Sequence, residues 1–338
     1  MAALVGGGVL AAAALVACVL VPGALAGWLA AVTAVCALPA GALVLSLMMR
    51  LIPGVWGEEL RLSTEAMTLL TPWAALAFVP VVAGLGAIYP WMRDAKLSAL
   101  QQLTLTPLCF AAVSAVRFAA LWALGRRMRA RRRTRATAAA GLVALPLLAG
   151  LAAFEWLLSL DPGFASSAFG LQFLERELTI AFAALLLLRL SLGRPPARPS
   201  VLGGLMLTLL LLWAYFEFLP FFINWSSDEP DGAAWYLARA RGGWGVLLWI
   251  WAALSGVPLL ALLFAKARNS VAALRWIAGT VIVGKLCELA WVTLPGFGIP
   301  AIAVDVAATG GLALVCAALL PSLLYRRIER RMPKEANR

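Results

Sequence analysis

Ten stretches of mostly apolar residues run through the chain, separated by short segments rich in charge, proline or glycine. An apolar helix of about 20 residues is long enough to cross the hydrocarbon core of a bilayer. Hydrophobic residues make up 63% of the chain and charged residues only 13%, far from the values of a soluble domain. The sequence therefore predicts an all-α integral membrane protein with about ten transmembrane helices. The predicted spans are 3–21, 24–48, 67–88, 102–124, 137–160, 168–191, 201–224, 243–265, 271–293 and 301–324.

Positive charge is distributed unevenly between the two sides that these spans define. With both termini placed in the cytoplasm, 21 Lys and Arg residues fall on the inner side and 4 on the outer side. Such an excess of inner positive charge is typical of bacterial inner-membrane proteins. The densest runs, 126–135 and 326–338, contain no interleaved aromatic residues, so the formal charge of +12 is interpreted as topogenic. We expect a multi-pass protein with a basic cytoplasmic tail over 325–338 and no nucleic-acid partner.

A weak internal repeat suggests how the helices are grouped. The pattern Trp-Ala, then Phe and Pro, beginning at Trp73 recurs with the same spacing at Trp213. Repeats that run in the same direction imply two bundles related by an axis along the membrane normal. We therefore expect one membrane domain over 1–338, with four-helix bundles over 24–160 and 168–293 and peripheral first and last spans. The segment Ala24–Ala26 resembles a signal-peptidase site, but no Lys or Arg precedes the first apolar stretch, which favours a retained first helix.

The residues that usually hold a redox centre are scarce. The chain has no histidine, and its five cysteines lie in apolar stretches without a CxxC pair. Histidine is the usual axial haem ligand, and cysteine thiolates hold iron–sulfur clusters. We therefore expect no haem or iron–sulfur ligands, no metal site and no covalently bound cofactor.

Charged residues inside predicted spans are expensive and point to function. The acids are predicted to lie in the outer half of the membrane, about 6 to 10 Å below the helix ends, with Arg117 nearer the inner face. This asymmetry predicts a polar half-channel or headgroup pocket between the bundles. The candidates for a proton path or a quinone pocket, none of them assigned as catalytic, are Glu155, Asp161, Glu217, Lys285, Glu288, Asp305, Glu175 and Glu177.

Spacing along the helices gives two further expectations. Lys285 and Glu288 are three residues apart and can pair, which leaves open that they only neutralise each other and fix one helix to its neighbour. The consecutive residues Glu175, Arg176 and Glu177 point about 100° apart on a helix, so they cannot all face one cavity. At least one of them is expected at the membrane interface, at a partner subunit or in an irregular start of the helix.

Two segments carry a family resemblance. Phe154–Gly170 resembles the "F-D-W-x-x-S-L-D-P-x-W-x-S-x-x-F-G" signature of the ActF-like membrane subunit of alternative complex III. Trp213–Arg239 resembles that family's "W-A-Y-x-x-F-S-Q-Y-x-L-I-W-x-x-N-x-P-E-E" segment. The family belongs to the NrfD-like, or polysulfide-reductase membrane-subunit, superfamily. Departures from the two patterns are Glu155 for Asp, Phe164 for Trp, Pro220 for Gln and Asp228 for Asn.

The resemblance implies a membrane subunit of a quinol:cytochrome c oxidoreductase without its own redox cofactor, which acts as a scaffold and a proton path. Its expected partners are membrane lipid, an NrfD-like quinol subunit, and iron–sulfur and cytochrome c subunits. Two alternatives stay open. Buried carboxylates and repeats are also typical of a proton-coupled secondary transporter, which would bind its substrate near the midplane. A third hypothesis places quinol oxidation in this subunit, with Glu155 or Glu217 as the base.

Overall fold

The computed structural model describes residues 1–93, 97–130, 134–191, 196–227 and 230–329, and every regular element among them is a helix. Nine helical segments in this part of the chain are long and apolar enough to cross a membrane, as expected for a multi-pass membrane protein. They are α1 (Ala2–Leu20), η1–α2 (Pro22–Leu51), α3–η2–α4 (Val55–Ala83), α7 (Pro107–Arg129), α8–η4 (Arg135–Leu160), α10 (Pro199–Ser226), α12 (Gly242–Leu263), α14 (Val271–Thr293) and α15 (Gly298–Glu329).

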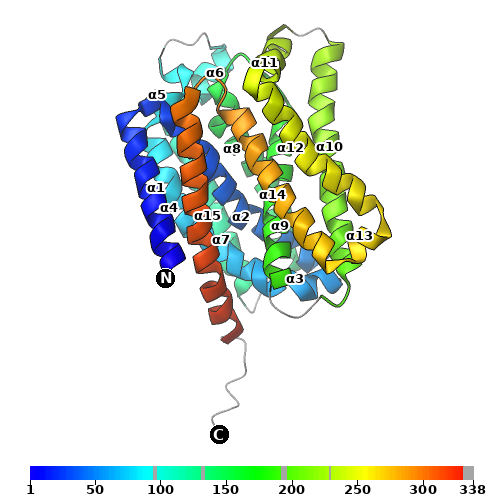
Figure 1. The fold of residues 1–338 in the computed structure, drawn as a ribbon. Coiled ribbons are helices and arrows are strands. Elements are labelled where there is room, and N and C mark those ends of the chain that lie inside the picture. The colour runs from blue at the N-terminus through cyan, green and yellow to red at the C-terminus, as the bar shows by residue number, and fades with distance from the viewer. Residues whose placement is uncertain (94–96, 131–133, 192–195, 228–229, 330–338) are drawn as a thin grey trace.

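The remaining predicted span, 168–191, corresponds to α9 (Phe169–Ser191), whose 23 residues are also long enough to cross a bilayer. Its apolar character is interrupted by three consecutive charged residues at 175–177. The start of α1 and the end of α15 lie at the same end of the bundle, here called the terminal end, and α11 lies at the opposite end (Figure 1). Helix α9 lies between α8 and α10 in the chain and packs against both.

Helix α2 forms the centre of the molecule. It packs against α9, α15, α8 and α4, and most of its residues are buried. Small residues allow these close approaches, as is common between transmembrane helices. A Cβ atom at Gly41 would collide with the Glu177 carbonyl oxygen, and one at Gly27 with the Ala301 carbonyl oxygen. These two glycines bring α9 and α15 against opposite ends of α2.

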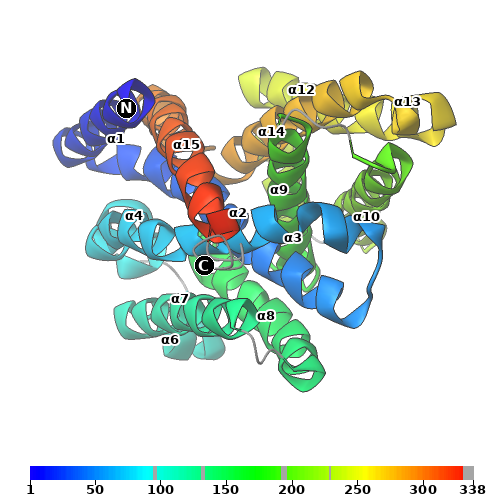
Figure 2. The same cartoon turned by 90° about the horizontal axis from the view of Figure 1, so that it is seen from below.

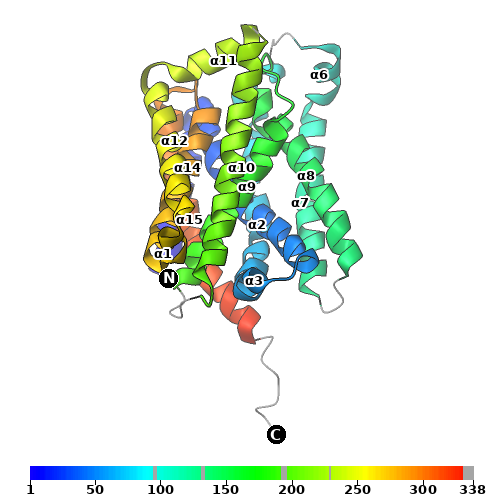
Figure 3. The same cartoon turned by 90° about the vertical axis from the view of Figure 1, so that its right-hand side faces the viewer.

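The first and last helices pack side by side at one edge of the bundle (Figure 2). Helices α7 and α8 lie on one side of α9, and α12 and α14 lie on the other (Figure 3), while α4 packs against α7. Helix α9 contacts α2, α3, α8, α10 and α14. A helix with so many helical neighbours has little surface left for lipid, which explains how its charged residues are accommodated.

Two predicted span boundaries are wrong. The third segment begins at Val55, because the amphipathic helix α3 (Val55–Met67) lies across the terminal end and continues through η2 (Thr68–Leu70) into α4 (Thr71–Ala83). Residues 85–88 form the separate helix α5 (Leu85–Ile88). The fourth span begins at Pro107, since α6 (Ala99–Thr104) is a distinct helix capped by Ser98.

Further short helices lie in the connections: η3 (Pro90–Met92), α11 (Pro230–Ala240) and α13 (Ala265–Asn269). Helix α15 extends to Glu329, so the predicted basic tail is helical in its first five residues, and residues 330–338 lie outside the described part. The segments 94–96, 131–133, 192–195 and 228–229, which include part of the predicted basic run and Asp228, also lie outside it.

The internal repeat does not place matching side chains in matching surroundings. Trp73 is exposed and Phe78 is buried on α4, whereas Trp213 is buried and Phe218 is exposed on α10. Both helices contain the repeat's proline, but α4 ends three residues after Pro80 while α10 continues for six residues after Pro220. The two copies therefore share spacing but present different faces to the core.

Candidate functional site

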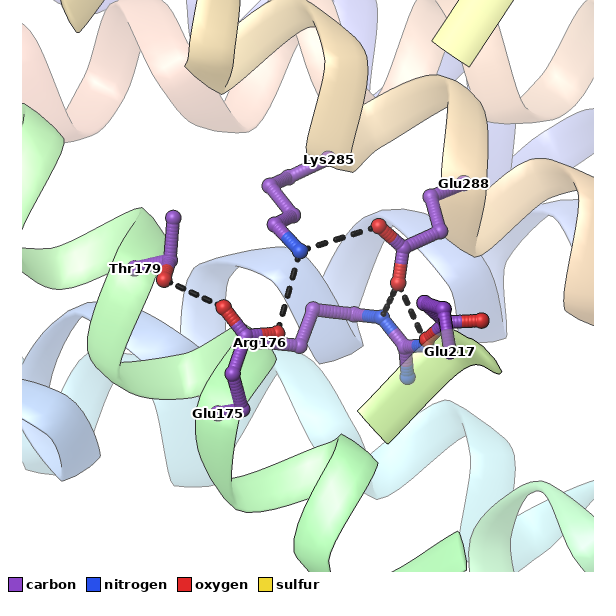
Figure 4. A network of polar contacts seen from close by, with 6 residues as sticks. All are labelled: Glu175, Arg176, Thr179, Glu217, Lys285 and Glu288. Carbon is purple, nitrogen blue, oxygen red and sulfur yellow. Dashed lines mark hydrogen bonds and ion pairs between the residues drawn. The ribbon is translucent and has the colours of Figure 1, made fainter. Parts of the chain in front are cut away.

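A network of charged side chains joins α9, α14 and α10 in the interior (Figure 4). Lys285 Nζ lies 3.0 Å from Glu175 Oε2 and 3.0 Å from Glu288 Oε2. A guanidinium nitrogen of Arg176 lies 2.6 Å from Glu288 Oε1 and 3.6 Å from Glu217 Oε1. These five residues are called the core network below. Four of them, Glu175, Glu217, Lys285 and Glu288, are among the eight predicted candidates, and Arg176 is the fifth member.

The core network is buried and carries unequal charge. The side chains of Lys285 and Glu288 are fully buried, that of Arg176 is 2% exposed, and that of Glu217 is 19% exposed. Three carboxylates face two cations, so the network has one negative charge in excess when every group is ionised. Burying an unbalanced charge costs far more than burying a paired one. Glu217 combines the longest ion-pair distance with the greatest exposed fraction, so it is the member that the two cations hold least tightly.

Helix geometry explains why these residues meet. Lys285 and Glu288 are three residues apart on α14, so they point to the same side and pair as expected. Glu175 and Arg176 are adjacent on α9, and they reach different members of the α14 pair. Thr179, one turn after Glu175, donates a hydrogen bond of 2.5 Å to the Glu175 carboxylate. Each charged group of α14 is thus held by a group from α9.

Aromatic side chains form one wall of the core network. Lys285 Nζ lies 5.1 Å from the centre of the Trp213 ring, within the range of a cation–π contact. Trp213 packs edge-on against Trp251, and Trp251 packs against Trp291. The indole nitrogens of Trp213 and Trp251 are buried and have no hydrogen-bond partner among the residues described. The Trp213 ring therefore covers one side of the network with apolar surface, and such surroundings strengthen electrostatic interactions.

A second ion pair lies on the other side of α9. Glu177 pairs with Arg117 of α7, and the Arg117 guanidinium lies 5.2 Å from the Trp156 ring centre and 5.3 Å from the Phe173 ring centre. The expectation that residues 175–177 diverge is confirmed. The expectation that one of them reaches the interface, a partner or an irregular helix start is wrong, because all three are buried within a regular helix.

Arg117 was expected nearer the inner face than the acids. Because α7 begins at Pro107 and not near 102, Arg117 lies close to the middle of this helix. There it pairs with Glu177, one of the acids.

Glu155 lines a separate cavity of about 500 Å³, between the end of α8, helix α6 and residues 162–167. Most of the lining is apolar, including Leu151, Phe154 and Leu158. Four serines also line the cavity: Ser98, Ser159, Ser166 and Ser167. Glu155 is buried, and its Oε2 atom has no hydrogen-bond partner in the described part of the chain. The arrangement can accept a hydrogen bond from a ligand that has an apolar body and a hydroxyl group.

Asp161 pairs with Arg239 at the end opposite the terminal end. The closest distance is 3.8 Å, and the Asp161 side chain is 48% exposed, so the pair is weak. Arg239 is held more firmly by α11 and α14, because its guanidinium lies 3.8 Å from the Trp235 ring centre and donates to the Val292 carbonyl. Burial lowers the pKa of Arg239 to about 10, and the group is still cationic at neutral pH.

The same region joins the two segments that carry the sequence resemblance. The Phe164 ring stacks on Trp235, with 4.3 Å between ring centres and an interplanar angle of 12°. Tyr236 packs edge-on against Phe164 and Phe221. Burial raises the pKa of Tyr236, and the nearby Glu217 carboxylate raises it further, so the phenol stays neutral. The two motif segments, 154–170 and 213–239, thus form one packed unit.

Asp305 lies apart from the other acids. It is on α15, where Thr309 donates to its carboxylate at 3.2 Å. The backbone nitrogen of Asp305 lies where a Cβ atom on Gly27 would collide, so this part of α15 packs against α2.

The structure does not gather all the predicted groups in one cavity. It brings Glu175, Glu217, Lys285 and Glu288 together, pairs Glu177 with Arg117, and gives Glu155, Asp161 and Asp305 separate surroundings. The expectation of a single half-channel lined by all of them is therefore replaced by one buried network and several isolated acids. Helix orientation about its own axis, which the sequence does not reveal, separates these groups.

Sequence analysis missed two acids on α3. Glu65 is 1% exposed and lies 2.6 Å from Arg327 of α15 and 3.4 Å from Arg61. Glu59 pairs with Arg189 of α9 at 2.5 Å. Arg189 and Arg327 had been counted as topogenic charges. The amphipathic pattern of residues 55–67 was the signal that could have identified a helix with buried acids.

No group of three or more His, Cys, Asp and Glu side chains in the described ranges is arranged to hold a metal ion. Comparison with known proteins adds no identification: no protein-family model matches the chain, and no curated protein matches it.

Proposed function

We propose that the chain is a membrane subunit of a bacterial respiratory complex that oxidises quinol, and that its core network takes up and releases one proton during turnover. The observation that carries the proposal is the charge imbalance of the core network, with three buried carboxylates and two buried cations. A proton on one carboxylate would make the network neutral. Glu217 is the proposed carrier, since it is the least buried member and lies farthest from its cation.

Topology supports this role. We place the terminal end in the cytoplasm, because the predicted basic loops and both termini lie there, and the membrane is the bacterial inner membrane. The core network then lies in the half nearer the periplasm. Helices α2, α4, α7 and α8 would form one four-helix bundle and α9, α10, α12 and α14 the other, with α1 and α15 peripheral. Residues 154–170 and 213–239, which resemble the alternative complex III subunit, support the assignment to a quinol:cytochrome c oxidoreductase.

In this proposal the chain is a scaffold without its own redox cofactor. Its partners would be an NrfD-like quinol subunit and the iron–sulfur and cytochrome c subunits. A tagged chain purified from native membranes in mild detergent should bring down proteins with haem and iron–sulfur absorption. Recovery as an isolated monomer would contradict the proposal. Uptake of a solute into proteoliposomes driven by a pH gradient would then favour a proton-coupled transporter.

The proton-handling role has a sharper test. Glu217→Gln removes the excess carboxylate, and Glu329→Gln, at the exposed end of α15, is the matched control. In the intact complex reconstituted into liposomes, we expect Glu217→Gln to release fewer protons per electron on the outer side and Glu329→Gln to match the native protein. Infrared difference spectra should lose a carboxyl band in Glu217→Gln alone. Unchanged proton release and an unchanged band would refute the role.

The Glu155 cavity fits a quinol headgroup, because it combines an apolar lining with one buried carboxylate oxygen that no described side chain satisfies. A bound quinol would supply two electrons and two protons on oxidation. In that site Glu155 would accept a hydrogen bond from a quinol hydroxyl, and Phe154 and Leu158 would exclude water. Equal quinol-oxidation rates for the native complex and Glu155→Gln would rule out a direct role for Glu155 as base.

A further inference from the structure

A basic cavity lies at the terminal end of the bundle, where α2 ends, α3 begins and α8 begins. Its volume is about 260 Å³. Three arginines from three different helices line it: Arg50 in the last turn of α2, Arg61 on α3 and Arg135 at the first position of α8. The core network is formed by other helices, so this cavity is independent of the proposed proton path.

The charges that line the cavity are unbalanced in favour of the cations. Among the described residues that line the cavity, Glu58 is the one carboxylate, against three guanidinium groups. Arg61 also lies 3.4 Å from Glu65, but Glu65 is shared with Arg327 at 2.6 Å. The Arg61 side chain is 41% exposed, so it can still turn its donors toward a ligand. Guanidinium groups bind phosphate oxygens in a bidentate manner, which suits an anionic ligand.

Backbone geometry adds to this preference. Gly54 precedes the first turn of α3 and lines the cavity, and within the described residues no side chain caps this turn. The amide groups at a helix N-terminus carry partial positive charge. The three arginines and the start of the 13-residue helix α3 therefore all contribute positive potential to the same cavity.

The rest of the lining indicates where such an anion would come from. Met49, Pro53 and Met128 provide an apolar side to the cavity. The cavity also lies at the ends of helices long and apolar enough to span a bilayer, which is the level of the lipid headgroups. A phospholipid can place its phosphate among arginines there and its acyl chains along the neighbouring helices. Basic pockets between transmembrane helices on the cytoplasmic side are known to bind anionic headgroups.

We propose that this cavity binds the phosphate group of an anionic phospholipid, held by Arg50, Arg61 and Arg135. The same chemistry would suit free phosphate, so the test must distinguish the two sources. Arg135→Gln is the preferred variant, because Arg135 is exposed and its loss leaves the helix packing intact. Arg61→Gln is the second variant. Arg326→Gln removes an exposed arginine of α15 outside the cavity and is the matched control.

The purified chain is delipidated and titrated with phosphatidylglycerol or zwitterionic phosphatidylcholine, and bound lipid is counted by native mass spectrometry. We expect a preference for phosphatidylglycerol that falls about five-fold in Arg135→Gln and in Arg61→Gln and is unchanged in Arg326→Gln. Inorganic phosphate at the same concentration should not displace the lipid.

Three results would overturn the proposal. Equal losses of phosphatidylglycerol binding in Arg135→Gln and Arg326→Gln would mean that lipid binding depends only on the overall surface charge. Displacement by inorganic phosphate would assign the cavity to a soluble anion. Equal binding of the two lipids would remove the anionic preference. Thermal unfolding of Arg61→Gln, whose partner Glu65 is buried, separates a binding defect from a folding defect.

Discussion

Arg176 on α9 lies 2.6 Å from Glu288 on α14, although 112 positions separate the two residues in the sequence. Both side chains are almost completely buried. The contact joins α9, which contains three consecutive charged residues, to α14, which contains Lys285. The charged side chains of this contact therefore face each other and not lipid. The stability of the bundle should therefore depend on balanced charge within the core network.

Replacing Lys285 by Met should destabilise the protein strongly. The substitution leaves Glu175 and Glu288 without their shared cation, and breaking a buried ion pair costs about 3–5 kcal/mol. Lys266→Met, at an exposed position of α13, is the control and should change stability by less than about 0.5 kcal/mol. Tryptophan fluorescence during denaturant unfolding in detergent measures the free energy of unfolding of both variants. Equal stability of the two variants would show that the network does not stabilise the fold.

Replacing Arg117 by Met should also destabilise the protein by about 3–5 kcal/mol, since Glu177 would keep a buried charge without its partner. Adding Glu177→Gln should restore most of the loss, because the double variant contains no unpaired charge. A double-mutant cycle from unfolding free energies gives the coupling between the two residues. Additive losses would mean that they do not interact.

Where the two motif segments pack together, the ring contact of Phe164 with Trp235 should contribute more to the free energy of unfolding than the ion pair of Asp161 with Arg239. Phe164 is buried against Trp235, and Phe164→Ala should cost about 3 kcal/mol or more. Asp161→Asn removes a half-exposed partner of Arg239 and should cost at most about 1 kcal/mol. Unfolding free energies of both variants test this order, and the reverse order would contradict it.

The packing of α1 on α15 should depend on Gly7 and not on Gly8. A Cβ atom at Gly7 would lie 2.6 Å from the Gly311 carbonyl oxygen, whereas one at Gly8 would have no heavy atom within 4 Å. Gly7→Val should therefore destabilise the protein by about 1–3 kcal/mol, and Gly8→Val should not. The thermal unfolding midpoints of the two variants provide the measurement. Similar midpoints would mean that α1 is not held by this close approach.

Much of the fold followed from local pattern. Apolar length identified the long helices because a lipid-facing helix must be apolar over the whole thickness of the bilayer. The segment at 271–293 was predicted to the residue, since Ser270 caps its start and charge-free turns follow its end. The prediction failed near 55–70 and 99–106, where amphipathic helices adjoin the apolar ones. Hydropathy alone does not separate these elements from the spans they join.

The candidate site was only partly predictable. The pairing of Lys285 with Glu288 follows from their spacing on one helix, and it is present. The pairing of Glu177 with Arg117 was not expected, because it depends on which face α9 turns toward α7. The buried state of Glu65 was missed for the same reason, since its partner Arg327 is 262 positions away.

The sequence by itself determined that this is a helical membrane protein, which residues are charged within its helices and which end is richest in arginine. Those properties depend on the amino-acid composition and on patterns that repeat every few residues along the chain. Only the tertiary structure decided that the charges of α9 divide between two ion networks and that Glu155, Asp161 and Asp305 stay apart from them. The rotation of each helix about its axis sets these contacts, and that rotation results from the packing of all its neighbours together.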